Sequence, residues 1–190
     1  MIQKIKKNLH LQPYLCREIE DEGISVEIDK RLREEQYGII KVDDYYRGLH
    51  LTITPKAIDF LVAVDCECDS FVLYLLELKN VKNPKYLVIS DIHEKFKITI
   101  EDFLSQRFAE IFLADQYKYK DIKLYLVSDA YGVGGKYQTH EQYRKVMDKV
   151  NKRDSLKIDR SLGSKLYRFK NRIVKIDYDI PPNPVIRRIV

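Results

Sequence analysis

Two acidic residues and one lysine mark the ends of apolar runs in the segment from residue 56 to residue 84. Asp59 stands just before one apolar run, and Glu77 and Lys79 close the next. Buried strands seldom carry charge at their ends on the inward face unless the charge has a partner or a function. These three side chains are therefore the first candidates for chemistry in the sequence.

Residues 58–65 and 71–79 are predicted to form an antiparallel hairpin. Paired positions in a hairpin have a constant sum, and pairing Asp59 with Glu77 puts the midpoint at 68, inside the polar turn. The two acids should then lie side by side at the open end of the hairpin, with Cβ atoms within about 5 Å. Lys79 should point to the same face as Glu77. Such convergent carboxylates favour a hard cation, Mg²⁺, which keeps water and substrate phosphate in its shell.

This arrangement resembles the PD-(D/E)xK nuclease superfamily, the fold of many type II restriction endonucleases. The resemblance covers roughly residues 24–130 and is carried by "AIDF", with Asp59, and by "YLLELKN", with Glu77 and Lys79. It implies that both acids bind Mg²⁺ together with the carbonyl of Leu78. It also implies that Lys79 places the attacking water and that Mn²⁺ can replace Mg²⁺.

The predicted fold class is α/β with a restriction-endonuclease-like core. That core is a central mixed β-sheet, an antiparallel hairpin plus a parallel crossover strand, flanked by helices. Strands 71–79 and 122–129 should be parallel neighbours across a right-handed crossover. Besides the hairpin, the patterning predicts helices at 24–37, at 100–117 with Thr99 as N-cap, and from Thr139. It predicts further strands at 48–54, 86–90 and 122–129, and a second hairpin that turns near Lys170 and Asn171.

Two acids on the predicted N-terminal helix, Glu34 and Glu35, are candidates for a further metal ligand. The resemblance implies this role, because some nucleases of the superfamily bring an extra acid from the helix before the hairpin. The alternative for each is a solvated, charged helix face.

Positive charge is concentrated near the C-terminus. The segment from Arg144 to Lys175 has 12 Lys or Arg and 3 Asp, an excess of nine, whereas the whole chain carries only +5. Such a distribution indicates either a face for a polyanion or a solvated surface. The residues predicted to contact double-stranded DNA are Lys136, Tyr137, Gln138, Thr139, His140, Arg144, Lys165, Arg168, Lys170 and Arg172.

The 190 residues, 45% of them hydrophobic, predict one globular domain. Residues 24–130 would be the nuclease core, and residues 131–190 a DNA-recognition loop, helix and basic tail. The sequence lacks 18 consecutive apolar residues and a signal-peptide core, and it has an odd number of cysteines, three. We therefore expect a cytoplasmic protein with no membrane partner, and the resemblance to restriction endonucleases implies a prokaryotic one.

With the resemblance, these features predict a Mg²⁺-dependent endonuclease, a type II restriction enzyme that recognises a short palindromic site. One site cuts one strand, so cleavage of a duplex calls for a homodimer. Two alternatives stay open: a DNA repair or junction-resolving nuclease of the same superfamily, and a non-catalytic DNA-binding module.

Overall fold

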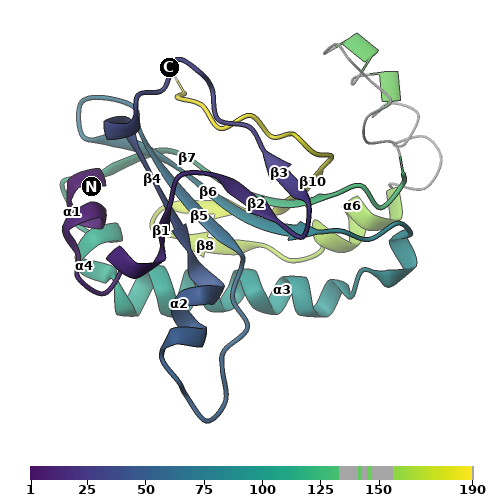
Figure 1. Cartoon of the computed structure of the whole chain (residues 1–190), viewed down its shortest axis with the longest axis horizontal. Helices are drawn as coiled ribbons and strands as arrows, with labels where there is room; N and C mark the ends of the chain where they lie inside the picture. The colour runs from purple at the N-terminus through teal and green to yellow at the C-terminus, as the bar shows by residue number, and fades with distance from the viewer. Residues whose placement is uncertain (133–140, 143–144, 147–155, 190) are drawn as a thin grey trace.

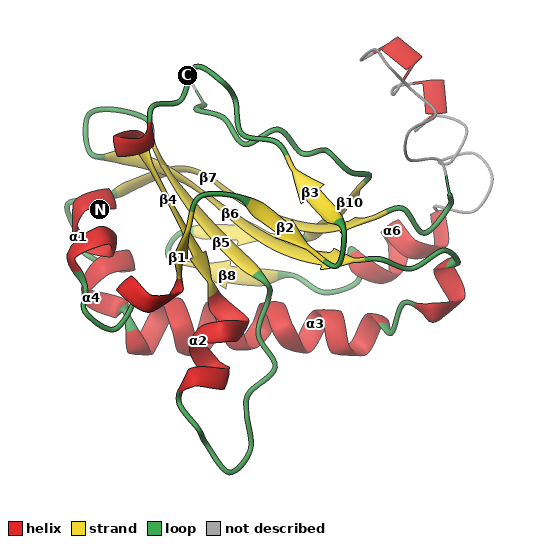
Figure 2. Ribbon diagram, in the orientation of Figure 1, coloured by secondary structure: helices red, strands yellow, loops and turns green. Residues whose placement is uncertain are grey.

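A six-stranded mixed sheet runs through the centre of the molecule, in the order β1-β4-β5-β6-β7-β10 (Figures 1 and 2). Strands β1 to β6 of this sheet are antiparallel neighbours, whereas β7 is parallel to β6 and β10 is parallel to β7. The structure is a computed structural model and describes residues 1–132, 141–142, 145–146 and 156–189. The strands are β1 Leu15–Cys16, β4 Tyr37–Lys41, β5 Phe60–Asp65, β6 Ser70–Lys79, β7 Lys118–Ser128 and β10 Ile176–Asp179.

Helices and two small hairpins complete the described fold. The hairpins pair β2 Ile19–Asp21 with β3 Ile24–Val26, and β8 Tyr167–Phe169 with β9 Arg172–Val174. The α-helices are α1 Ile2–Lys7, α2 Val42–Gly48, α3 Ile89–Ile98, α4 Ala109–Phe112 and α6 Leu156–Leu162. Short 3₁₀ turns are η1 Gln12–Tyr14, η2 Glu34–Gln36 and η3 Pro84–Tyr86, and η4 Thr99–Arg107 is a π-helix.

The central sheet is buried on both faces, which explains the nearly continuous apolar run of β6. Leu73 and Leu75 belong to a core that contains the apolar side of α3 and η4, while Tyr74 and Leu76 belong to a core under β2, β3 and the C-terminal segment. Figure 1 shows these two layers on opposite sides of the sheet. By alternation along β6, Glu77 faces the helix layer.

The predicted hairpin register is confirmed. Phe60 pairs with Leu76 across β5 and β6, so Asp59, the residue before β5, comes opposite Glu77. The parallel pairing of β6 with β7 is confirmed as well, with Lys79 opposite Ser128. The carboxyl ends of both strands therefore meet at the edge of the sheet that carries Glu77 and Lys79.

The predicted start of the crossover helix is wrong by about three turns. The helix begins at Ile89 and continues through η4 to Arg107, and Thr99 lies inside it instead of capping it. The strand predicted at 86–90 is likewise absent: a 3₁₀ turn opened by Pro84 leads directly into α3. The apolar residues of "YLVIS" suggested a strand, but Ile92 and Phe96 continue the helical spacing into the core.

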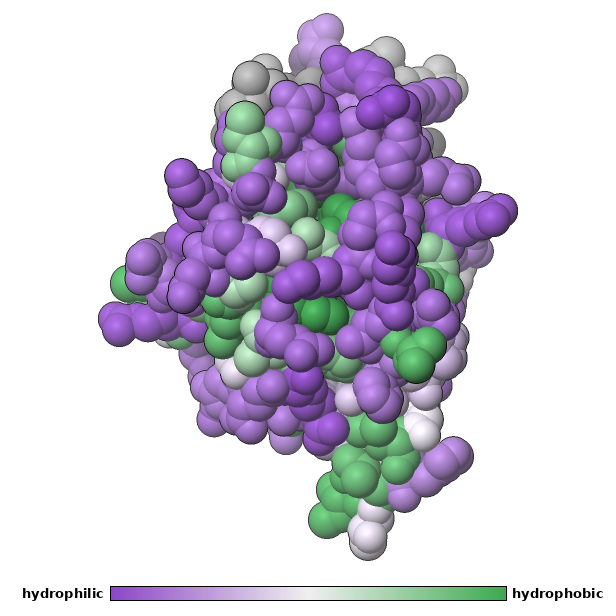
Figure 3. Space-filling view, turned by 90° about the vertical axis from the view of Figure 1, so that its left-hand side faces the viewer, coloured by the Kyte–Doolittle hydropathy of each residue, from purple (hydrophilic) through white to green (hydrophobic). Residues whose placement is uncertain are grey.

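Two more predicted elements differ from those in the structure. Residues 24–37 are not a helix: Ile24 and Val26 are buried on one side of strand β3 and Ser25 is exposed, a period of two. Residues 48–54 are not a strand, because no described strand pairs with them: Gly48 ends α2, and the residues after it form a loop in which Ile53 is 83% exposed. Figure 3 shows an apolar protrusion at the foot of the molecule, where Figure 1 has this loop between α2 and β5.

In the C-terminal part, the structure confirms one predicted element and contains one strand pairing that was not predicted. The predicted turn at Lys170 and Asn171 joins β8 to β9. Strand β10 lies in the second half of the predicted hairpin segment, 165–179, but it pairs with β7 at the edge of the central sheet, which the patterning did not predict. The helix predicted from Thr139 lies largely outside the described residues. Within the described part of the chain, no helix has the length and apolar character to cross a membrane.

Candidate active site

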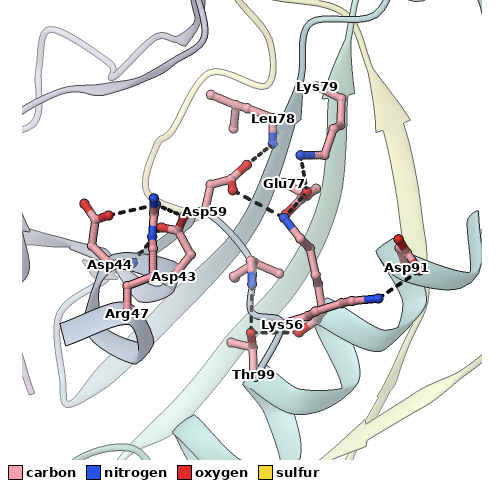
Figure 4. Close-up of polar contacts among 12 residues, drawn as sticks. Asp43, Asp44, Arg47, Lys56, Asp59, Glu77, Leu78, Lys79, Asp91 and Thr99 are labelled. Carbon is pink, nitrogen blue, oxygen red and sulfur yellow. Dashed lines mark hydrogen bonds and ion pairs between the residues drawn. The ribbon is translucent and has the colours of Figure 1, made fainter. Parts of the chain in front are cut away.

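Asp59 and Glu77 lie together at the end of the β5–β6 ladder (Figure 4). Asp59 is 4% exposed and Glu77 is fully buried, so both carboxyl groups lie beneath the surface. One oxygen of Asp59, Oδ2, accepts a hydrogen bond of 2.7 Å from the amide of Leu78. This bond fixes Asp59 against strand β6, next to the residue that it opposes.

Lys79 lies on the same side of β6 as Glu77. Its Nζ is 2.9 Å from Glu77 Oε1, and its side chain is 32% exposed. The structure thus brings Asp59, Glu77 and Lys79 into one cluster. Within this cluster, Lys79 is less deeply buried than the two acids.

A second lysine, Lys95 of α3, completes the cluster and was missed by sequence reasoning. Its Nζ lies 2.6 Å from Glu77 Oε1 and 3.6 Å from Asp59 Oδ1. Placing the start of the helix near Thr99 left Lys95 in a presumed connecting segment. The signal that could have found it is the apolar spacing of Ile92 and Phe96, which extends the helix upstream past Lys95.

Thr99 connects Lys95 to the segment that carries Asp59. Its Oγ1 donates to the carbonyl oxygen of Lys95 at 2.9 Å and accepts the amide hydrogen of Ile58 at 3.3 Å. Ile58 directly precedes Asp59, and Thr99 is fully buried. This one hydroxyl group therefore sets the position of α3 relative to the strand end that carries the acid.

The cluster contains two carboxylates and two ammonium groups. Burial, and secondly the charge of Glu77, raise the pKa of Asp59 to about 7, although Lys95 acts in the opposite direction. Burial alone would lower the pKa of Lys79, but the adjacent Glu77 carboxylate more than offsets it and holds that pKa above its ordinary value. Lys79 therefore stays protonated at neutral pH.

The donors at this site fit a small divalent cation. Glu77 Oε2 is buried, and no partner lies within hydrogen-bonding distance among the described residues. Leu78 directs its carbonyl to the same side as its amide, toward Asp59, because both groups of one strand residue point the same way. Within the described ranges no three His, Cys, Asp or Glu side chains gather as a metal site. The candidate ligands are thus two carboxylates and one carbonyl, and Mg²⁺ fills such a set with water.

The structure does not bring Glu34 and Glu35 to this site. They lie in η2 before β4, whose Tyr37 pairs with Val64, at the far end of β5. Val64 is five positions along the strand from Asp59, a distance of about 16 Å.

The other acids near Asp59 are Asp43 and Asp44 at the start of α2 (Figure 4). That helix begins beside the site because the amide of Val42 donates to the carbonyl of Asp59 at 3.0 Å. Arg47 pairs with both aspartates, at 2.8 Å for Asp44. Sequence reasoning missed this arrangement because it did not predict α2.

The predicted DNA contacts fall into three groups. Lys136, Tyr137, Gln138, Thr139, His140 and Arg144 lie outside the described residues. Lys165 and Arg168 are exposed. Lys170 and Arg172 instead donate to backbone carbonyls near the start of β7, Lys170 to Ala114 and Tyr117 and Arg172 to Tyr119.

These carbonyls lie far from the carboxylates. Tyr119 pairs with Phe71, six strand residues before Glu77, or about 20 Å along β6. Lys170 and Arg172 are therefore bound at the end of the sheet opposite the candidate site.

Comparison of the chain with protein-family models, with curated proteins and with solved structures finds no match in any of the three.

Proposed function

We propose that this protein is a Mg²⁺-dependent endonuclease that hydrolyses phosphodiester bonds in double-stranded DNA. The observation that carries the proposal is the placement of Asp59 opposite Glu77 at a strand end, where Glu77 Oε2 is buried and has no partner among the described residues. A buried carboxylate oxygen without a hydrogen bond is costly, and a bound cation removes that cost.

The sheet topology supports a restriction-endonuclease-like core. Three antiparallel strands, β4, β5 and β6, are followed by the crossover through α3 and by β7 parallel to β6. The first acid precedes the second of these strands, and Glu77 and Lys79 close the third. This is the placement that the resemblance to the PD-(D/E)xK superfamily implies.

In the proposed mechanism, Asp59, Glu77 and the Leu78 carbonyl would hold Mg²⁺. The bound ion would offset the negative charge that develops during hydrolysis and make its water more acidic. Lys79 donates a hydrogen bond to the attacking water. Its ammonium group orients this water. The water oxygen forms a new bond to phosphorus and gives up its proton to solvent, while the in-line bond to the leaving sugar oxygen breaks and that oxygen takes up a proton from solvent.

We further propose a type II restriction enzyme that acts as a homodimer on a palindromic site. The support is the resemblance together with symmetry: each chain contributes one cluster, and a twofold axis would place two clusters on opposite strands.

One observation favours a second candidate, a non-catalytic DNA-binding module. The two acids are matched by two ammonium groups, Lys79 and Lys95, so the cluster is neutral without a metal ion once both acids are ionised. Buried charges that are paired in this way also occur as purely structural features.

Incubation with supercoiled plasmid and Mg²⁺ separates these candidates. Discrete linear fragments are expected for a restriction enzyme. Cleavage of branched DNA only would indicate a junction-resolving or repair nuclease instead. Gel retardation of DNA without any cleavage, by protein whose fold is verified by circular dichroism, would favour the binding module.

A further inference from the structure

The ammonium group of Lys95 lies between the two carboxylates of the candidate site. It contacts Glu77 Oε1 at 2.6 Å and Asp59 Oδ1 at 3.6 Å, and no other lysine of the described residues pairs with both acids. Lys79 pairs with Glu77 only. Lys95 is thus the cation that bridges the pair.

A metal ion held by the same two carboxylates cannot easily share this space with Lys95. Mg²⁺ binds carboxylate oxygens at about 2.0–2.1 Å, which would bring the ion within a few ångströms of Nζ. A divalent cation and an ammonium group at that separation repel strongly in a partly buried site. Lys95, which contacts both acids, is therefore the cation that a metal ion bound to both acids would displace.

We propose that Lys95 and the metal ion exchange at the Asp59–Glu77 pair. Lys95 neutralises the carboxylates in the metal-free protein, and its side chain moves away when the metal binds. This inference rests on the proposed function, because it takes the metal site as given. It assigns Lys95 as a positioning residue that sets metal affinity.

The surroundings of Lys95 allow such a movement. Its side chain is 19% exposed, so solvent lies next to the cluster. Its four-carbon stem is flexible, whereas the Thr99 hydroxyl holds its backbone carbonyl in place. The side chain can therefore turn while the helix stays fixed. The phosphodiester that arrives with the metal offers the displaced ammonium a new anionic partner.

Calorimetric titration with Mn²⁺ tests the exchange in the absence of DNA. Lys95→Met should bind Mn²⁺ about tenfold more tightly than the wild type, or more, because the competing cation is gone. Lys79→Met is the matched control: it removes the same charge from the same Glu77 oxygen but leaves the bridge between the acids. We expect a smaller change for it, because Lys79 is more exposed and its charge is better screened.

A measurement on the wild-type protein avoids any folding defect of the variant. Addition of Ca²⁺ should increase the rate at which Lys95 is acylated, as measured by peptide mass spectrometry, because the amine loses its two carboxylate partners. Lys56, an exposed lysine paired with Asp91 and Glu94, provides the internal reference.

The outcomes separate the exchange from the metal site itself. If the wild type binds Mn²⁺ and Asp59→Ala does not, while Lys95→Met binds no more tightly than Lys79→Met, the exchange is contradicted and the metal site stands. Unchanged or slower acylation of Lys95 with bound Ca²⁺ also contradicts it. If neither the wild type nor Lys95→Met binds Mn²⁺, the proposed metal site fails, and the exchange fails with it.

Discussion

Asp59 Oδ2 accepts the amide hydrogen of Leu78 at 2.7 Å, so the first acid of the candidate site is held by the backbone of the strand that carries the second. The bond runs from the residue before the start of β5 to the last residues of β6, where regular pairing of the two strands stops. It fixes one carboxylate oxygen and leaves the other directed at Lys95. The protonation state of Asp59 should therefore affect the stability of the whole strand end.

We predict that metal-free protein loses stability as the pH rises from about 4 to about 7. The pKa of Asp59 is raised from 3.8 to about 7, so over this interval the folded protein keeps a proton that the unfolded chain releases. The free energy of unfolding then falls by at most about 1.4 kcal/mol for each pH unit. Above pH 7 Asp59 is ionised in both the folded and the unfolded protein, so it no longer makes the free energy of unfolding depend on pH.

Urea denaturation in EDTA at a series of pH values measures this slope. The control is Asp59→Asn, which keeps an oxygen for the Leu78 amide but cannot titrate. Its stability should lack the Asp59 contribution to the slope. An identical pH dependence in the two proteins would contradict the raised pKa.

We predict that Thr99→Val destabilises the fold by about 1–3 kcal/mol, because the buried amide of Ile58 loses its acceptor. Valine has nearly the shape of threonine, so packing changes little. The urea midpoint measures the effect, and Thr52→Val in the exposed loop is the control. Equal midpoints for the two variants would show that the Thr99 hydroxyl does not hold α3 to the strand.

The cluster of Asp59, Glu77 and Lys79 could be predicted from sequence because it depends on local rules. A short polar turn fixes the hairpin register, and the register decides which residues face each other. Lys95 could not be found in the same way, since the first turns of α3 have strand-like apolar residues and no side-chain N-cap. Its partners are decided by packing between layers.

The other differences have the same origin. The loop at residues 48–54 alternates like a strand, but only a neighbouring strand could have made it one. Strand β10 is short, and it forms because β7 offers an open edge far away in sequence. The residue pattern of 176–179 does not indicate this pairing, whereas the helical crossover between β6 and β7 made those two strands predictable neighbours.

We predict that the choice of metal separates DNA binding from hydrolysis. Ca²⁺ accepts the same carboxylate oxygens with longer and more flexible coordination, so it should support DNA binding with little cleavage. Mn²⁺ should replace Mg²⁺ in cleavage. Parallel gel-shift and cleavage assays measure both properties, and full cleavage in excess EDTA would show that the carboxylates do not serve a metal.

We predict that basic residues of the C-terminal part differ in their effect on DNA binding. Lys165→Ala and Arg168→Ala, at exposed positions, should weaken DNA binding. The slope of log affinity against log salt concentration should become shallower by about 0.9 for each phosphate that the variant no longer neutralises. Arg172→Ala should lower stability and leave DNA affinity nearly unchanged, because its guanidinium donates to the Tyr119 carbonyl.

Fluorescence anisotropy with labelled duplex at several salt concentrations measures the affinities. A decrease in affinity for Arg172→Ala as large as that for Lys165→Ala would show that the start of β7 also faces DNA.

The central claim is that Asp59, Glu77 and Lys79 act together in metal-dependent hydrolysis of DNA. Single-turnover cleavage of plasmid in Mg²⁺ tests it most directly, with Asp59→Ala, Glu77→Ala and Lys79→Ala beside the wild type. Glu94→Ala, which changes a half-exposed acid on α3, is the matched control. Each of the three variants should lose about 10³-fold or more in rate, without additivity, and should still bind DNA, while Glu94→Ala cleaves normally. Near-normal cleavage by folded Glu77→Ala, or a folded wild type that cleaves no DNA, would contradict the account.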